Sequence, residues 1–201
     1  GIPPLKGGIP EEKICVVPHF VLDPLAIDVS LNQNQSDVPY ALYEGSITEE
    51  KNITELCSIF ERLHFPLYLA GTKQMNIVMN QYVRYVGEQS KEDLEQLIRQ
   101  AHFVVSASRL PETFGLIVLE ANILGRPFFG YVTGAYSEIV TNGKNGWLTN
   151  NQTSFEGIMR DFIQGKIQCD APAIIMANTR EKYGVDTYVK KINQLFMQVK
   201  N

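Results

Sequence analysis

Two glutamates with a glycine between them form the segment of this sequence best suited to ligand chemistry. Seven residues separate Glu112 from Glu120, and Gly115 opens an apolar run expected to be helical. Gly115 lets a ligand approach the backbone, and the free N–H groups of the first helical turn would seat a phosphate. Glu120 is the only charge between Gly115 and Gly125, so its carboxylate needs a partner such as a ribose hydroxyl. The arrangement suits a nucleotide sugar.

A purely structural interpretation of the same glutamates stays open. A glutamate near a helix N-terminus often only stabilises the helix dipole. Glu120 could also form an ion pair with Arg126 or Arg109. For either glutamate alone this is the commoner case, so the choice depends on the surrounding sequence.

Further motifs accompany the two glutamates along the chain. They are Gly8–Pro18, Tyr43–Gly45 with Lys51, Val86 with Gly87, Glu112–Gly125 followed by Pro127, Gly134–Val140 and Asn142–Leu148. As a set, in this order and spacing, they resemble the C-terminal half of a family 4 glycosyltransferase, a retaining enzyme of the GT-B fold. The resemblance covers nearly the whole chain. It implies transfer of a sugar from a nucleoside-diphosphate sugar to a glycan, lipid or small-molecule acceptor.

The resemblance assigns the donor diphosphate to the loop that contains Gly45. In the family this loop carries an arginine and a lysine; the lysine corresponds to Lys51, but Ser46 occupies the arginine position. A serine offers one neutral hydrogen bond where a guanidinium clamps a phosphate with two, so about 1 to 3 kcal/mol of affinity would be lost. Arg109 and Lys73 are candidates to replace the missing cation.

The resemblance also implies the remaining roles in the site. Glu112 would contact the hydroxyls of the donor sugar and act in catalysis together with Lys51, and Glu120 would bind the ribose. The backbone cradle for sugar and phosphate would consist of Thr113, Phe114, Gly115 and Leu116. The base would lie near Arg84, Tyr85 and Val86.

A retaining transfer would have to stabilise an oxocarbenium-like sugar and a departing diphosphate. Lys51 and the helix dipole at Gly115 would offset the charge on the leaving group. We expect no cofactor and no metal ion, because the family needs no Asp-x-Asp motif and the sequence has none. Two alternatives stay open: a non-catalytic nucleotide-sugar-binding module, which Ser46 would favour, and a GT-B-type epimerase or hydrolase. The last would need an acid–base pair beyond Glu112.

Length and composition predict a single domain over residues 1–201. A chain of 201 residues that is 44% hydrophobic can bury a substantial core without disulfides, so we expect its 3 cysteines to be reduced. The net charge of −4 argues against a nucleic-acid surface. The sequence has no run of 18 apolar residues and no signal-like N-terminus, so we expect no membrane span and a cytoplasmic protein.

The resemblance makes this domain the donor-binding half of a larger enzyme. Residues 1–22 would cross from an acceptor-binding N-terminal domain that is absent from the chain, and a helix over 185–199 would pack back against it. The missing half could also attach the protein to the inner face of a membrane.

Strand-like and helical runs alternate along the chain. We expect strands at Val38–Glu44, Pro66–Ala70, Tyr82–Val86, His102–Ala107 and Pro127–Val132, and helices at Glu49–Leu63, Lys91–Gln100 with Ser90 as its N-cap, Gly115–Leu124, Phe155–Ile163, Ala173–Tyr183 and Asp186–Val199. The polar segment Asp23–Asp37 is expected to be a loop. The alternation predicts an α/β fold with a Rossmann-like, doubly wound parallel sheet, in agreement with the C-terminal half of a GT-B fold, and it places ligands at the carboxyl ends of the strands.

Overall fold

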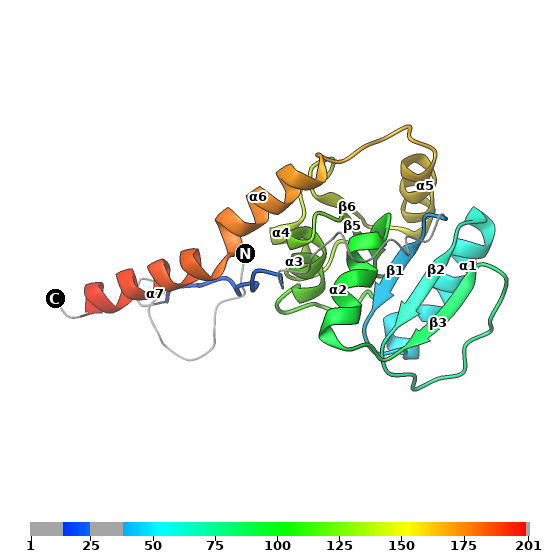
Figure 1. Cartoon of the computed structure of the whole chain (residues 1–201), viewed down its shortest axis with the longest axis horizontal. Helices are drawn as coiled ribbons and strands as arrows, with labels where there is room; N and C mark the ends of the chain where they lie inside the picture. The colour runs from blue at the N-terminus through cyan, green and yellow to red at the C-terminus, as the bar shows by residue number, and fades with distance from the viewer. Residues whose placement is uncertain (1–13, 25–37, 200–201) are drawn as a thin grey trace.

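The computed structural model describes residues 14–24 and 38–199. Its centre is a parallel sheet of six strands in the order β3-β2-β1-β4-β5-β6 (Figure 1). The strands are β1 (Ala41–Glu44), β2 (Leu67–Ala70), β3 (Val83–Gly87), β4 (Phe103–Val105), β5 (Phe128–Tyr131) and β6 (Gly146–Thr149). The strand order reverses between β1 and β4, the switch point at which such sheets bind ligands. The Rossmann-like, doubly wound α/β sheet is therefore confirmed.

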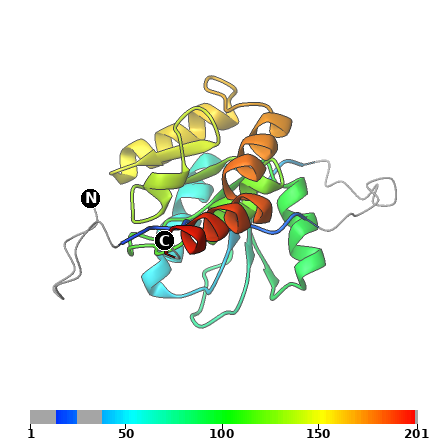
Figure 2. The same cartoon turned by 90° about the vertical axis from the view of Figure 1, so that its left-hand side faces the viewer.

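Helices cover both faces of the sheet, as Figure 2 shows. They are α1 (Ile53–Leu63), α2 (Lys91–Gln100), α3 (Leu116–Ile123), α4 (Tyr136–Ile139), α5 (Gln152–Ile163), α6 (Pro172–Tyr183) and α7 (Val185–Val199), with a 3-10 turn η3 (Glu49–Lys51) before α1. One core cluster joins the sheet to α1 and α5, and the other joins it to α2, α3 and α4. Neighbouring strand residues alternate between these clusters: Tyr43 belongs to the first and Leu42 to the second. A sheet buried on both faces explains the almost continuous apolar strands.

The local signals in the sequence placed most elements correctly. α2 begins and ends as expected, and the Ser90 hydroxyl accepts a hydrogen bond from the Asp93 N–H at 3.1 Å. The single helix expected over Glu49–Leu63 is wrong, because Asn52 adopts the left-handed conformation, with φ at 59°, and separates η3 from α1. Asparagine tolerates this conformation better than most residues.

Two elements were not expected from the sequence. β6 lies between glycine- and asparagine-rich turns and opens on Gly146, a poor strand residue, so its pattern resembled a loop. Register with β5, where Phe129 pairs with Trp147, makes it a strand. The one-turn helix α4 is too short to show a helical period.

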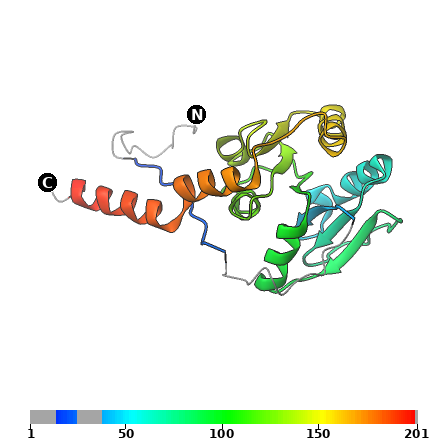
Figure 3. The ribbon, with the colours of Figure 1, turned by 45° about the horizontal axis from the view of Figure 1, so that its top comes forward.

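The segment 14–24 runs beside the junction of α6 and α7 (Figures 1 and 3). The Val21 N–H donates to the Tyr183 carbonyl at 2.8 Å, and Val21 forms a parallel bridge with Gly184. Arg180 pairs with Asp23 at 2.7 Å, and Phe20 packs against Tyr188. Residues 1–13 of the expected crossing segment, and 25–37 of the expected loop, lie outside the described residues.

The helix α7 extends away from the sheet (Figures 1 and 3). Its large apolar side chains Val189, Phe196 and Met197 are exposed. The helix expected over 185–199 is confirmed as an element, and its packing against a further domain stays a prediction.

Candidate functional site

A cavity of about 210 Å³ opens at the carboxyl ends of β1 and β4, at the switch point of the sheet. Its lining comprises Tyr43, Glu44, Gly45, Ser46, Lys51, Ser106, Glu112, Leu116, Ile117 and Tyr136. Five of the residues predicted from the sequence meet here: Gly45, Ser46, Lys51, Glu112 and Leu116. They come from the loop after β1, the turn η3 and the loop that leads into α3. We call this the switch-point cavity.

The loop after β1 is fixed by its own backbone. The Tyr43 hydroxyl donates to the Ser46 carbonyl at 2.8 Å, and the Gly45 N–H donates to the Ala70 carbonyl at 3.1 Å. A Cβ on Gly71 would lie 2.1 Å from the Gly45 carbonyl oxygen, so the loops after β1 and β2 touch only because position 71 is glycine. These contacts fix the position of the loop that brings Ser46 to the cavity.

The helix α3 begins at a glycine that no other residue could replace easily. Gly115 is its N-cap, with φ at 68°, and no side chain caps the first turn. A Cβ there would lie 2.6 Å from the Ile139 side chain. The N-terminus of α3 can therefore interact with an anion in the adjoining cavity.

Glu112 precedes this turn and lies partly buried in the switch-point cavity. Its carboxylate reaches the Phe114 N–H at 3.5 Å, a long contact that leaves the oxygens available to a ligand. Its main chain is held more firmly, because the Ala135 N–H donates to the Glu112 carbonyl at 2.8 Å.

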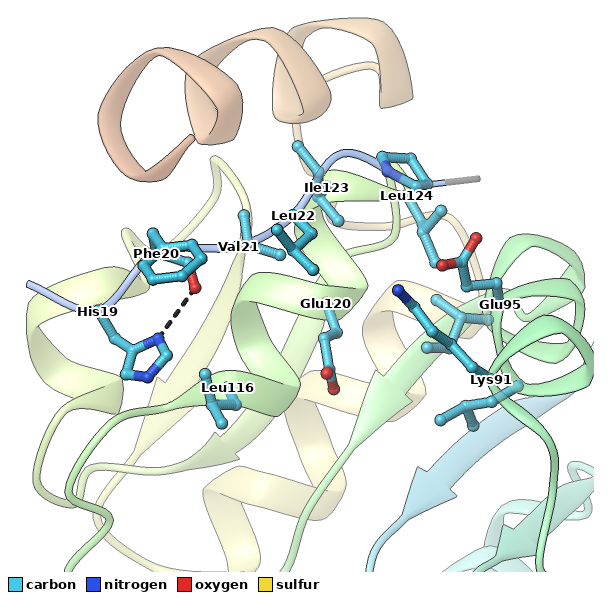
Figure 4. A pocket seen from close by; sticks show the side chains of 13 residues that line it. His19, Phe20, Val21, Leu22, Lys91, Glu95, Leu116, Glu120, Ile123 and Leu124 are labelled. Carbon is cyan, nitrogen blue, oxygen red and sulfur yellow. Dashed lines mark hydrogen bonds between the residues drawn. The ribbon is translucent and has the colours of Figure 1, made fainter. Parts of the chain in front are cut away.

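Glu120 lines a second cavity, of about 320 Å³, between α2 and α3 and under the segment 19–24 (Figure 4). Lys91 and Glu95 of α2 lie across it, and most of the remaining lining is apolar. Burial above all, and then the charge of Glu44, raise the pKa of Glu120 to about 7.

The ion pair considered for Glu120 is not formed in the described part of the chain. Arg109 pairs instead with Glu55, at 3.6 Å, and its guanidinium lies 4.2 Å from the centre of the Tyr131 ring. Within residues 14–24 and 38–199, Arg126 makes no ion pair, and its Nε is buried without a hydrogen-bond partner.

The two candidate replacement cations do not line the switch-point cavity. Arg109 is held by α1 and β5 as described, and the Lys73 ammonium lies 5.8 Å from the Tyr85 ring. Among the described residues, Lys51 is the only Lys or Arg in the lining.

The residues expected near the base lie on β3, outside both cavities. Arg84 lies over the Tyr68 ring, and the Tyr85 hydroxyl donates to the Gly71 carbonyl at 2.9 Å. The Val86 carbonyl accepts from the Gln89 amide at 2.6 Å. These contacts stabilise the edge of the sheet. Arg84, Tyr85 and Val86 are not among the residues that line the switch-point cavity or the cavity beside Glu120.

Thr113 and Phe114 face a third cavity, of about 380 Å³, beside residues 16–20. The Phe114 side chain is exposed and meets His19 edge-on, with ring centres 5.3 Å apart. The Phe114 side chain therefore faces the N-terminal segment, and neither Thr113 nor Phe114 is part of the lining of the switch-point cavity.

The sequence interpretation missed Glu44 and Tyr136 as cavity residues. Glu44 ends the buried strand β1, and burial raises the pKa of its carboxyl group while Lys51 lowers it. Burial is also the main cause of the raised pKa of Tyr136, which therefore stays a neutral hydroxyl. A carboxylate directly after an apolar strand and before a glycine was the signal that could have identified Glu44.

Neither a metal centre nor a membrane helix is found in the described ranges. Residues 14–24 and 38–199 contain no cluster of three His, Cys, Asp or Glu placed to hold a metal ion. No helix among them combines the length and apolar character needed to cross a bilayer.

The parallel sheet and its crevice define a Rossmann-like domain of the kind found in GT-B glycosyltransferases. The chain belongs to the family described as Glycosyl transferases group 1, whose sequence model matches residues 29–182. The family assignment made from the two-glutamate motif is therefore confirmed at this level. Family 4 and retention stay predictions.

Two proteins of Methanocaldococcus jannaschii are similar in sequence, and both carry the name "Uncharacterized glycosyltransferase". MJ1178 is 25% identical over 143 residues, covering 66% of this chain and 40% of that protein. MJ1607 is 27% identical over 164 residues, covering 69% and 42%. The chain thus spans less than half the length of these relatives.

Solved structures agree in fold. Anabaena Alr3699/HepE, crystallised with UDP and glucose, has a TM-score of 0.66 at 18% identity, covering 80% of this chain and 48% of that one. AviGT4, a glycosyltransferase involved in avilamycin A biosynthesis, has a TM-score of 0.63 at 20% sequence identity, and the match covers 78% of this chain and 50% of AviGT4. Sucrose-phosphate synthase of Thermosynechococcus elongatus has a TM-score of 0.64 at 22% sequence identity, and the match covers 81% of this chain and 46% of the synthase.

Proposed function

We propose that this chain is the donor-binding half of a retaining glycosyltransferase that moves a sugar from a nucleoside-diphosphate sugar to a glycan, lipid or small-molecule acceptor. The observation that carries the proposal is the meeting of Gly45, Ser46, Lys51, Glu112 and Leu116 around the switch-point cavity. The structure of HepE with UDP and glucose supports a nucleotide-sugar donor, because the fold is shared.

The proposed roles follow from the chemistry of the lining. Lys51 and the N-terminus of α3 offset the charge of the diphosphate as it departs, and Glu112 orients the hydroxyls of the sugar. Glu120 accepts hydrogen bonds from the ribose diol. In this proposal the transfer of the sugar requires neither a metal ion nor a cofactor.

The acceptor site belongs, in this proposal, to a further N-terminal domain. The exposed apolar side chains of α7, Val189, Phe196 and Met197, offer a surface for contact with it. We place the enzyme in the cytoplasm, where nucleotide sugars are the expected donors.

Calorimetric titration of the chain with UDP-, GDP- and ADP-glucose tests the donor site. We expect at least one to bind with a stoichiometry of one, and no sugar transfer by the chain alone. No binding of any of them at millimolar concentration contradicts the donor site, and repeated turnover with a simple acceptor contradicts the half-enzyme.

A second candidate is a nucleotide-sugar-binding module without catalysis. It is favoured by the absence of a second cation beside Lys51 among the described residues that line the cavity. The two candidates predict different activities for a longer protein that includes an acceptor domain. Transfer by that protein that falls in Lys51→Ala supports the enzyme, and tight donor binding without any transfer supports the module.

A further inference from the structure

The switch-point cavity holds a carboxylate for which the proposed function has no use. Glu44 lines it together with Ser46 and Lys51. Glu44 is the last residue of β1 and pairs in register with Ala70. Because Tyr43 packs with α1 and strand side chains alternate, the Glu44 side chain leaves the sheet on the side of α3.

Charged and titratable groups from four elements face Glu44. Lys51 comes from η3, Glu112 from the loop before α3, Tyr136 from α4 and Glu120 from α3. Glu120 in turn faces Lys91 and Glu95 of α2. Within the described residues, the lining of the cavity carries two carboxylates and one lysine, a poor match for two anionic phosphates.

Protonation of one carboxyl group would reduce this mismatch, because the charged side chains of the lining would then sum to zero. Burial raises the pKa of Glu44, and burial together with Glu44 raises that of Glu120 to about 7. Because the two carboxylates interact, a proton on either one favours the ionised form of the other. A diphosphate placed beside Glu44 favours the state in which Glu44 carries it.

We propose that Glu44 controls the charge of the donor cavity, so that a nucleoside-diphosphate sugar binds beside Lys51 with one proton on the Glu44 carboxyl group. The inference rests on the proposed donor site. The proton comes from solvent, and no covalent bond changes. The neutral carboxyl group donates a hydrogen bond to a phosphate oxygen. This donor partly replaces the guanidinium that the family has at the position of Ser46. The deprotonated group repels the same phosphate.

The experiment measures donor affinity from pH 6 to 8.5, using whichever of UDP-, GDP- and ADP-glucose binds. These sugar esters keep both phosphates ionised over the range, so their own titration does not enter. We expect the affinity of the natural sequence to fall as the pH rises, by up to tenfold per pH unit, the limit for one proton. Glu44→Gln keeps the shape and a donor N–H, so the fall in affinity with rising pH should disappear and the affinity at pH 8 should be several-fold higher. Glu61→Gln, an exposed carboxylate of α1, should keep the natural slope.

A readout without ligand accompanies the titration. The pKa of Glu120, followed by the ¹³C signal of its carboxyl group, should fall in Glu44→Gln because a neighbouring charge is lost. Should Glu44→Gln fold poorly, Glu44→Val gives the same expectations for the pH slope and for the Glu120 pKa, although valine donates no hydrogen bond to the phosphate. Flat binding by the natural sequence, weaker binding by the variants with the slope retained, or an unchanged Glu120 pKa overturns the inference and leaves the donor site standing. Failure of every donor to bind overturns both.

Discussion

The main-chain carbonyl of Glu112 accepts a hydrogen bond from the Ala135 N–H at 2.8 Å. The contact joins the two-glutamate motif to the turn that opens α4. Gly134 makes it possible, because a Cβ there would lie 2.1 Å from the same carbonyl oxygen. The position of Glu112 in the cavity therefore depends on a residue that lines none of it.

Gly134→Ala should destabilise the chain and abolish donor binding. The backbone has φ at 43°, and a left-handed residue with a Cβ costs about 1 to 2 kcal/mol before the clash with Glu112 is added. Urea unfolding and calorimetric titration measure the two effects. Gly157→Ala is the matched control: it lies inside α5 with open space around it, and should stabilise the chain by about 0.5 to 1 kcal/mol. Normal donor affinity in Gly134→Ala would contradict the coupling.

Glu120→Gln should weaken donor binding at pH 8 by about 1.5 to 3 kcal/mol, because an anionic acceptor for the ribose diol is lost. The preference for the ribonucleotide over its 2′-deoxy analogue should shrink by a similar factor. Titration of both nucleotides measures this, with Glu92→Gln on the exposed side of α2 as the control. Unchanged affinity would remove Glu120 from the site.

The stability of Glu120→Gln should depend on pH in a definite direction. The folded-state pKa of Glu120, about 7, exceeds the ordinary value of 4.5, so its contribution to stability is fully present below pH 4.5 and lost as pH rises through 7. Glutamine does not titrate. The melting temperature of the variant relative to the natural chain should therefore rise between pH 5 and pH 8. A decrease over that interval would mean that the Glu120 carboxylate has a stabilising partner.

Ser46→Arg should strengthen binding of a nucleoside diphosphate by about 1 to 3 kcal/mol, because a guanidinium can clamp a phosphate beside Lys51. Ser58→Arg adds the same charge on α1, outside the lining of the cavity, and should change affinity little. Equal effects of the two variants would show that only net charge matters. No gain in Ser46→Arg would mean that the loop does not face the phosphates.

Asn122→Leu should cost about 2 to 4 kcal/mol of stability, since it leaves several buried groups unpaired. The Asn122 amide donates to the Arg126 carbonyl at 2.9 Å and the Asn145 carbonyl at 3.0 Å, and accepts from Asn145 at 2.7 Å. Denaturant unfolding compares it with Asn150→Leu at an exposed turn. A small loss in Asn122→Leu would contradict the importance of this network.

The sequence predicted the sheet because its signals were local. Apolar strand runs, the Ser90 cap and the glycine before Leu116 each act within a few residues. β6 was missed because its strand character comes from pairing with β5, which no local pattern reports.

The site was predictable only in part, for a similar reason. Spacing pointed to Glu112 and Gly115, at the start of a predicted helix, and the family resemblance pointed to Lys51. Arg109 is held by Glu55 and Tyr131, which are distant from it in the sequence. Whether Glu44 lines the cavity depends on which face of β1 borders α3. Such relationships exist only once the sheet has formed.

The bridge between Val21 and Gly184 has a mechanical consequence. It fastens the segment 14–24 to the joint between α6 and α7, and the Arg180–Asp23 pair reinforces the fastening. The segment 14–24 therefore links α7 to the start of α3, because its His19 contacts the Phe114 ring beside Gly115.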